Sequence, residues 1–251
     1  MATQEIITVS NPIAGGAGWG GVSWPEANAL QWAGFFGSDW PNNDDTFDQS
    51  LRYQRATRIG TPARDANSIA PNAASYIQLP YTDTQALAAG VPGEVTLCGL
   101  IRGNDANAVL LSTYANTAQS HLRLYLTASG SLVASADKGA EAQQSVSLAR
   151  SPVSGAWEYI GATFTAAGIT VYRRNASDAD MLTATAALTI SSLEGGGVAF
   201  RAGANANTQG VDGTAQLASV AVYNKGLSAS EHAANYAALK EFSAARTSIV
   251  I

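Results

Sequence analysis

The sequence predicts an all-β sandwich of the jelly-roll type with one short helix near the C-terminus. From residue 75 onward, short apolar or alternating segments are separated by turn residues, a pattern typical of sandwiches and jelly rolls. Helical periodicity begins only after Ser228. With 251 residues, 46% of them hydrophobic, the chain can form one large all-β domain, or such a domain and an N-terminal module.

Strand signals recur along the chain between turn residues. The segment 121–126 alternates strictly between apolar and other residues, and Ser129-Gly130 turns it back into the next segment, which indicates a hairpin. A second hairpin is indicated around the turn Ala166-Ala-Gly168. We expect strands over residues 75–79, 94–102, 108–114, 121–126, 131–135, 157–164, 169–174, 197–201 and 215–223.

The segment 217–239 reads as a strand, a turn and a capped helix. Asn224-Lys225-Gly226 has turn composition, and Ser228 with Glu231 forms the pattern of a capping box. The helix then repeats bulky residues every three or four positions, which predicts one buried stripe. The stripe consists of His232, Tyr236, Leu239 and Phe242, so we expect His232 to pack against the sheet.

The first 72 residues differ in composition from the rest. Four of the five tryptophans lie within the first 40 residues, each near Gly or Pro: Trp19, Trp24, Trp32 and Trp40. We expect a loop-rich segment that either extends the sandwich or serves as an attachment arm. Its indoles can pack against the sheet or a neighbouring subunit, or they can stack on sugar rings. For the second role the candidates are Trp19, Trp24 and Trp40.

Residues 42–48 gather oxygen ligands of the kind that Ca²⁺ prefers. Asp44, Asp45 and Asp48 are therefore candidate metal ligands, although the segment lacks the glycine and the acidic spacing of a calcium loop. Turn or capping chemistry is the alternative for these residues. We predict no other cofactor.

Composition limits the classes of partner. Charged residues make up only 13% of the chain and the net charge is −5, without a basic cluster interleaved with aromatics, which argues against nucleic-acid binding. We expect the arginines Arg52, Arg55, Arg58 and Arg64 to form local salt bridges or to contact a partner.

No apolar run reaches the length of a membrane span. The lone Cys98 lies in an apolar run and is expected to be buried.

Several of these segments together resemble the laminin-G-like (concanavalin A-like) jelly rolls. We place such a domain at residues 73–251, and the resemblance covers about residues 73–245. Ser75–Leu79 is similar to the opening strand, Trp157–Phe164 to a later strand of a hairpin, and the strand, turn and helix at 217–239 to the end of such domains. It implies a concanavalin A-like jelly-roll fold that recognises ligands. An Asp-Glu pair common in the family is replaced here by Ala218 and Ser219, so no ligand role is carried over to them.

The sequence also argues against catalysis. The Glu-x-Asp-x-x-Glu motif of related glucanases is absent, as are a Gly-x-Ser-x-Gly elbow and Cys/His clusters of zinc sites. The only histidines are His121 and His232. We therefore predict a protein that is not an enzyme.

The leading hypothesis is a bacteriophage virion protein of the tail fibre, tail tip or capsid decoration. The low-charge composition rich in small residues, a lectin-like fold and no visible signal peptide favour this setting. We expect a homo-oligomer that contacts other virion proteins and a host-surface glycan, and that leaves the cell within the particle. The alternatives are a bacterial carbohydrate-binding or adhesion module and a purely structural cement protein.

Overall fold

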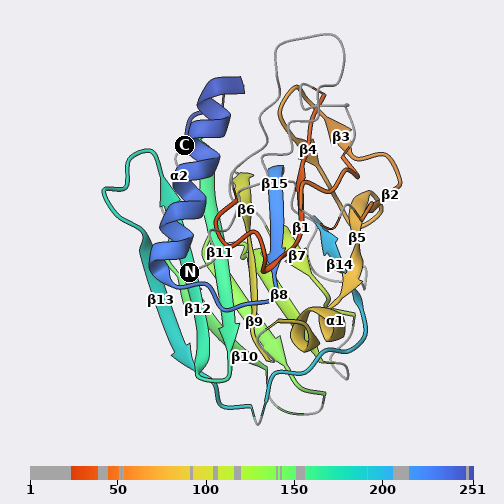
Figure 1. Ribbon diagram of the computed structural model, residues 1–251, viewed down its shortest axis with the longest axis vertical. Helices are drawn as coiled ribbons and strands as arrows, with labels where there is room; N and C mark the ends of the chain where they lie inside the picture. Colours follow the sequence, from red (N-terminus) through yellow and green to blue (C-terminus); the bar gives the residue numbers. More distant parts are fainter. Residues whose placement is uncertain are drawn as a thin grey trace, which may run out of the picture.

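The computed structural model shows two antiparallel sheets packed face to face, as the sequence predicts (Figure 1). It describes residues 24–38, 45–50, 52, 54–90, 93–103, 107–115, 120–139, 141, 143–150, 156–190, 192–205, 215–246 and 249–251.

Sheet A has eight strands among the described residues. Its order is β13 (Leu182–Ala187), β12 (Gly168–Asn175), β11 (Glu158–Thr165), β6 (Val95–Arg102), β15 (Gln216–Tyr223), β4 (Ile69–Ala70) and β3 (Ala63–Arg64), and β1 (Leu30–Phe35) also pairs with β15.

Sheet B has seven strands among the same residues. Its order is β10 (Gln144–Leu148), β9 (Leu132–Asp137), β8 (His121–Leu126), β7 (Val109–Ser112), β14 (Ala199–Ala202), β5 (Tyr76–Thr82) and β2 (Thr57–Ile59).

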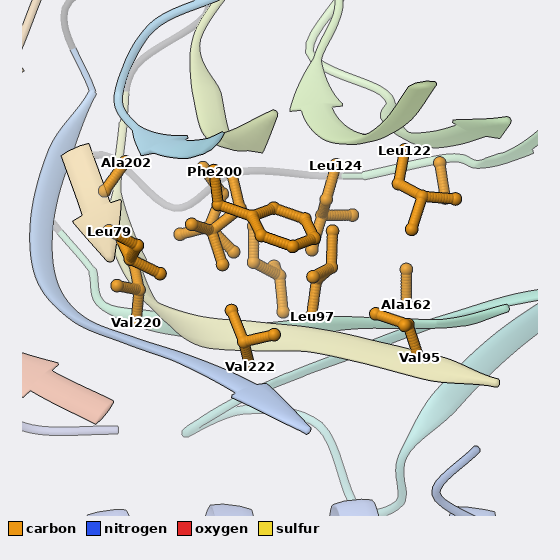
Figure 2. Packing of buried hydrophobic residues seen from close by; sticks show 14 of the residues in the cluster. Leu79, Val95, Leu97, Leu122, Leu124, Ala162, Phe200, Ala202, Val220 and Val222 are labelled. Atoms are coloured by element: carbon orange, nitrogen blue, oxygen red, sulfur yellow. The ribbon is translucent and has the colours of Figure 1, made fainter. Parts of the chain in front are cut away.

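Both predicted hairpins are confirmed. Strands β8 and β9 pair antiparallel from His121–Asp137 to Leu126–Leu132, and β11 pairs with β12 over the full length of both strands. The alternation in β8 places Leu122 and Leu124 between the sheets, where Figure 2 shows them facing Val95, Leu97 and Ala162 of sheet A. These apolar faces form the main core, which drives the association of the two sheets.

The described part of residues 1–72 contributes strands to the sandwich. Strand β1 pairs with the central strand β15, and β2 extends sheet B beyond β5. Trp32 of β1 is fully buried in the main core, and its indole Nε1 donates a hydrogen bond to the Gln54 carbonyl at 3.0 Å. Residues 24–38 and 54–70 therefore share the sheets and the core of the segment that follows.

A second helix, α1 (Asp83–Ala88), was not predicted. It has its own capping box: the Gln85 amide donates to Thr82 Oγ1 at 3.2 Å, and the Thr82 amide donates to Gln85 Oε1 at 2.9 Å. The buried Asp83 carboxylate accepts from the amides of residues 196–198 and ties α1 to that turn. Six residues are too few for a periodic pattern, so the sequence carries no helical signal there.

The C-terminal helix α2 (Ala229–Arg246) lies across the outer face of sheet A, over β11 and β12 (Figure 1). Its predicted cap is confirmed, because the Ser228 amide donates to Glu231 Oε2 at 2.7 Å and the Glu231 amide donates to Ser228 Oγ at 3.4 Å. Tyr236 and Leu239 belong to a second apolar cluster with Cys98 of β6, so this face of the sheet is covered. Cys98 is buried, as expected.

His232 of α2 is fully buried against sheet A, as its place on the stripe predicts. Its Nδ1 is 2.7 Å from the Tyr159 hydroxyl, its Nε2 is 3.0 Å from Thr163 Oγ1, and its ring stacks on Tyr172. Gly161 leaves room for the ring, since a Cβ there would lie 2.7 Å from His232 Cε1. In the described residues, no helix is both long and apolar enough to cross a membrane.

Candidate functional site

The outer face of sheet B carries a continuous row of polar side chains. In β8 the residues between the core leucines point away from the other sheet, because successive side chains in a strand alternate between the two faces. The strand register then places one polar residue of every strand in the same row. From β10 to β2 the row reads Ser145, Ser135, Arg123, Ser112, Arg201, Gln78 and Thr57.

Tyrosine rings hold the two arginines of this row. The Arg123 guanidinium lies 3.8 Å from the centroid of the Tyr125 ring and 5.3 Å from that of Tyr114. The Arg201 guanidinium lies 4.8 Å from the Tyr76 ring centroid. Such cation–π contacts fix the two guanidinium groups on the face of the sheet.

The loop after β14 also reaches the row through Asn205. Ser112 Oγ donates to the Asn205 side-chain oxygen at 2.9 Å, and Arg201 Nη1 donates to the Asn205 carbonyl at 3.2 Å. The Tyr114 amide donates a hydrogen bond to Ser112 Oγ at 2.9 Å, so Ser112 also holds the backbone of the tyrosine that contacts Arg123. The middle of the row is thus pre-organised by bonds between its own strands and loops.

A buried His–Asp pair lies one step from the row. His121 and Asp137 face each other across β8 and β9, with 4.0 Å between His121 Nδ1 and Asp137 Oδ2. The edge of His121 meets Tyr114, with the ring centroids 4.7 Å apart. Burial raises the pKa of Asp137, and the Lys138 amide opposes that rise.

Three buried polar atoms on this face have no hydrogen-bond partner in the described part of the chain. They are Arg123 Nε, Ser135 Oγ and Asp137 Oδ1, which come from the adjacent strands β8 and β9. Buried polar atoms are nearly always hydrogen-bonded, and leaving one unpaired costs about 1–3 kcal/mol. Their grouping on one face is what a site for a polar ligand requires.

A hollow of about 270 Å³ beside α2 is the competing location. Hydroxyl groups of β11, β12 and β13 line it together with Tyr172 and Ser228. None of its described lining residues carries a buried polar atom without a partner. The outer face of sheet B is therefore the stronger candidate.

The predicted sugar-stacking tryptophans do not contribute to this face in the described structure. Trp24 is 7% exposed and packs against Phe35, with 5.9 Å between ring centroids, in the cluster on the side of α2. Its ring therefore offers no free face for stacking. Trp19 and Trp40 lie outside the described residues.

The candidate metal ligands that the structure describes are held by protein donors. Asp45 accepts from the Gly37 amide at 3.1 Å and lies 3.2 Å from Arg64 Nε. Asp48 accepts from the Ala33, Ser50 and Gln54 amides at 3.2, 2.8 and 2.9 Å. Among the described residues, no group of three or more His, Cys, Asp or Glu is placed to hold a metal ion. Asp44 lies outside them.

The sequence offers a signal for only part of this face. The strict alternation of residues 121–126 already places His121, Arg123 and Tyr125 together. The residues that β7, β14 and β5 contribute to the row could not be predicted from the sequence, because these strands are neighbours in the sheet but distant along the chain.

Compared by sequence, the chain matches no protein-family model and no curated protein. Compared by structure, it is similar to domain 4 of the arabinanase AbnA of Geobacillus stearothermophilus, solved with arabinotriose. The TM-score is 0.56 at 13% identity, covering 82% of this chain and 97% of that one. The fold is a β-sandwich shared with binding domains.

Bacterial toxins carry the same fold. The structure of botulinum neurotoxin type C, which depends on two ganglioside molecules to enter cells, gives a TM-score of 0.60 at 9% identity over 85% of this chain. The binding domain of Paraclostridial Mosquitocidal Protein 1 gives 0.58 at 14% identity over 84%. This chain spans about half the length of both toxin chains, 51% and 52%.

Proposed function

We propose that this protein is a saccharide-binding module whose ligand lies on the outer face of sheet B. The observation that carries the proposal is the seven-strand row of polar side chains, in which buried atoms of Arg123 and Ser135 have no hydrogen-bond partner among the described residues. The row is flanked by tyrosines, and aromatic rings beside hydrogen-bonding groups suit the alternating apolar and hydroxyl surfaces of a sugar.

The dimensions of the row favour an oligosaccharide over a single sugar. Neighbouring strands lie about 4.8 Å apart, so the row is roughly 29 Å long. Arginine and glutamine offer several donors each, and the serine hydroxyls donate or accept. Arg123, Arg201 and Gln78 would bind ligand hydroxyls, while Tyr76 and Tyr125 would border them.

The structural neighbours support this proposal. The arabinanase domain that matches over nearly its full length was solved with arabinotriose, and the neurotoxin neighbour depends on gangliosides. At these identities the likeness carries the fold, so the choice of face rests on the residues of this chain.

We also propose a biological setting for this binding, the surface of a virus particle. We infer a non-enzymatic lectin-like component of a bacteriophage tail or capsid, laminin-G-like in architecture, which acts without a cofactor as a homo-oligomer on the virion. The support is the composition, with 13% charged residues and a net charge of −5. Many copies on one particle would raise the avidity of a weak site.

A glycan array with the protein displayed multivalently tests the function. We expect binding to a defined set of oligosaccharides and a loss of about tenfold or more in Gln78→Ala, since buried hydrogen bonds to a ligand contribute about 1–3 kcal/mol. Thr183→Ala, an exposed strand position on sheet A outside the hollow beside α2, is the control. Absence of binding to every saccharide, or an equal loss in both variants, would contradict the proposal.

A further inference from the structure

Arg123 is half-buried, and among the described residues no carboxylate forms an ion pair with it, in contrast to the buried Arg150 and Arg173. Its guanidinium lies over the rings of Tyr114 and Tyr125, and within the described residues it forms no ion pair and no hydrogen bond. Burial lowers its pKa, with the two neighbouring tyrosines as the opposing influences. Its Nε is buried, while its terminal nitrogens are not among the buried unpartnered atoms.

The arginines at the end of the sandwich show the usual arrangement. Arg150 Nε lies 2.9 Å from Glu158 Oε2, and Arg173 is 3.7 Å from the same carboxylate and 3.0 Å from Asp178. A cation removed from water needs such a partner, because ring contacts recover only part of the lost hydration. Arg123 is half-buried, its Nε fully so, and it has no such partner among the described residues.

No described acidic side chain near Arg123 takes the part of a carboxylate partner. Asp137 faces His121 in the next register pair and forms no ion pair with Arg123 in the described structure. Ser135 lies directly opposite Arg123, and its hydroxyl has no partner there. Two unpartnered donors on neighbouring strands therefore face the same side of the sheet.

We propose, on the basis of the saccharide-binding function above, that the ligand is an acidic saccharide whose anionic group binds at Arg123. A carboxylate or a sulfate ester would accept hydrogen bonds from the guanidinium, whose planar fork suits two oxygens of one acid group. The Ser135 hydroxyl would donate to the same group. The rest of the row, beginning with Ser112 and Arg201, would bind the neutral sugar hydroxyls.

An array of paired probes tests this inference. Oligogalacturonate, hyaluronan oligosaccharides and sialyllactose are printed beside their methyl esters, and sulfated heparin fragments are printed beside desulfated ones. We expect at least one probe to bind about 10- to 100-fold more tightly than its esterified or desulfated counterpart, the range of one charge-assisted hydrogen-bonded contact. The carboxylate and sulfate pairs identify which anion is recognised.

Variants locate the contact. Arg123→Gln should abolish the preference for the acidic probe, and Arg123→Lys should keep part of it, because lysine retains the charge without the fork. Arg174→Gln is the matched control: this arginine also lies over a tyrosine, 4.7 Å from the Tyr236 ring, but on the other sheet. If Arg123→Gln fails to fold, Arg123→Lys and the salt dependence of wild-type binding give the same information.

The two proposals fail in different ways. Equal affinity for an acid and its ester, or an acid preference that survives in Arg123→Gln, would overturn the acidic ligand and leave the saccharide-binding function standing. If no probe of either kind binds, both proposals fall.

Discussion

Acidification should destabilise this protein through one residue, His232. The imidazole is completely buried between α2 and sheet A, where both ring nitrogens lie within hydrogen-bonding distance of hydroxyl groups. Burial lowers its pKa to about 3, although the nearby Glu231 carboxylate opposes the shift. The folded protein therefore holds His232 neutral at pH values at which a solvated histidine is charged.

The direction and size of the effect follow from proton linkage. An unfolded chain binds a proton at His232 near pH 6.5, whereas the folded chain does not until about pH 3. The free energy of unfolding should thus be independent of this residue above pH 7 and decrease by about 1.4 kcal/mol per pH unit below 6.5. At pH 5 the expected loss from His232 is about 2 kcal/mol.

Urea unfolding at pH 7.5 and pH 5.0 measures this loss. The wild type should lose about 2 kcal/mol more stability between these pH values than His232→Gln, which cannot bind the proton. Carboxylates titrate alike in both proteins and cancel in the difference. His121→Asn, which removes the other histidine, controls for a contribution from sheet B.

Parallel losses in the wild type and His232→Gln would refute this reasoning. If the glutamine variant does not fold, NMR of the wild type replaces it. The imidazole signals of His232 should stay constant from pH 7.5 to 4.5, and a titration near pH 6.5 would contradict the buried neutral state.

Three further predictions concern stability. Gly161→Ala should lower the free energy of unfolding by about 1–3 kcal/mol, because the added methyl group overpacks against His232. This loss should be smaller in a His232→Ala background, and additive effects in the double-mutant cycle would contradict the contact. Glu158→Gln should cost about 3–5 kcal/mol in urea unfolding because it leaves Arg150 buried without its counter-charge, and a loss below about 1 kcal/mol would argue against that ion pair. Ser228→Ala should cost about 1 kcal/mol by removing the cap of α2, visible as a lower thermal midpoint, whereas an unchanged midpoint would show that the cap is dispensable.

Much of the fold was predictable because its signals are local. The alternation in 121–126, the turn at 129–130 and the capping box at 228–231 each specify a conformation within a few residues, and the hairpin and cap are present. The helix α1 was missed because a capped six-residue turn carries no periodicity. Of the predicted site residues that the structure describes, Trp24 is part of an apolar cluster, and Asp45 and Asp48 accept hydrogen bonds from protein donors.

The sequence alone establishes which residues of a strand share a face, since side-chain direction alternates with position along the chain. It places Arg123 beside His121 and Tyr125 on one face and the leucines of 121–126 on the other. Only the tertiary structure decides which strands lie next to each other, because strand order depends on long-range packing between segments that are distant in sequence. That order joins β8 through β7 and β14 to β5, and so assembles the polar row that contains Arg123.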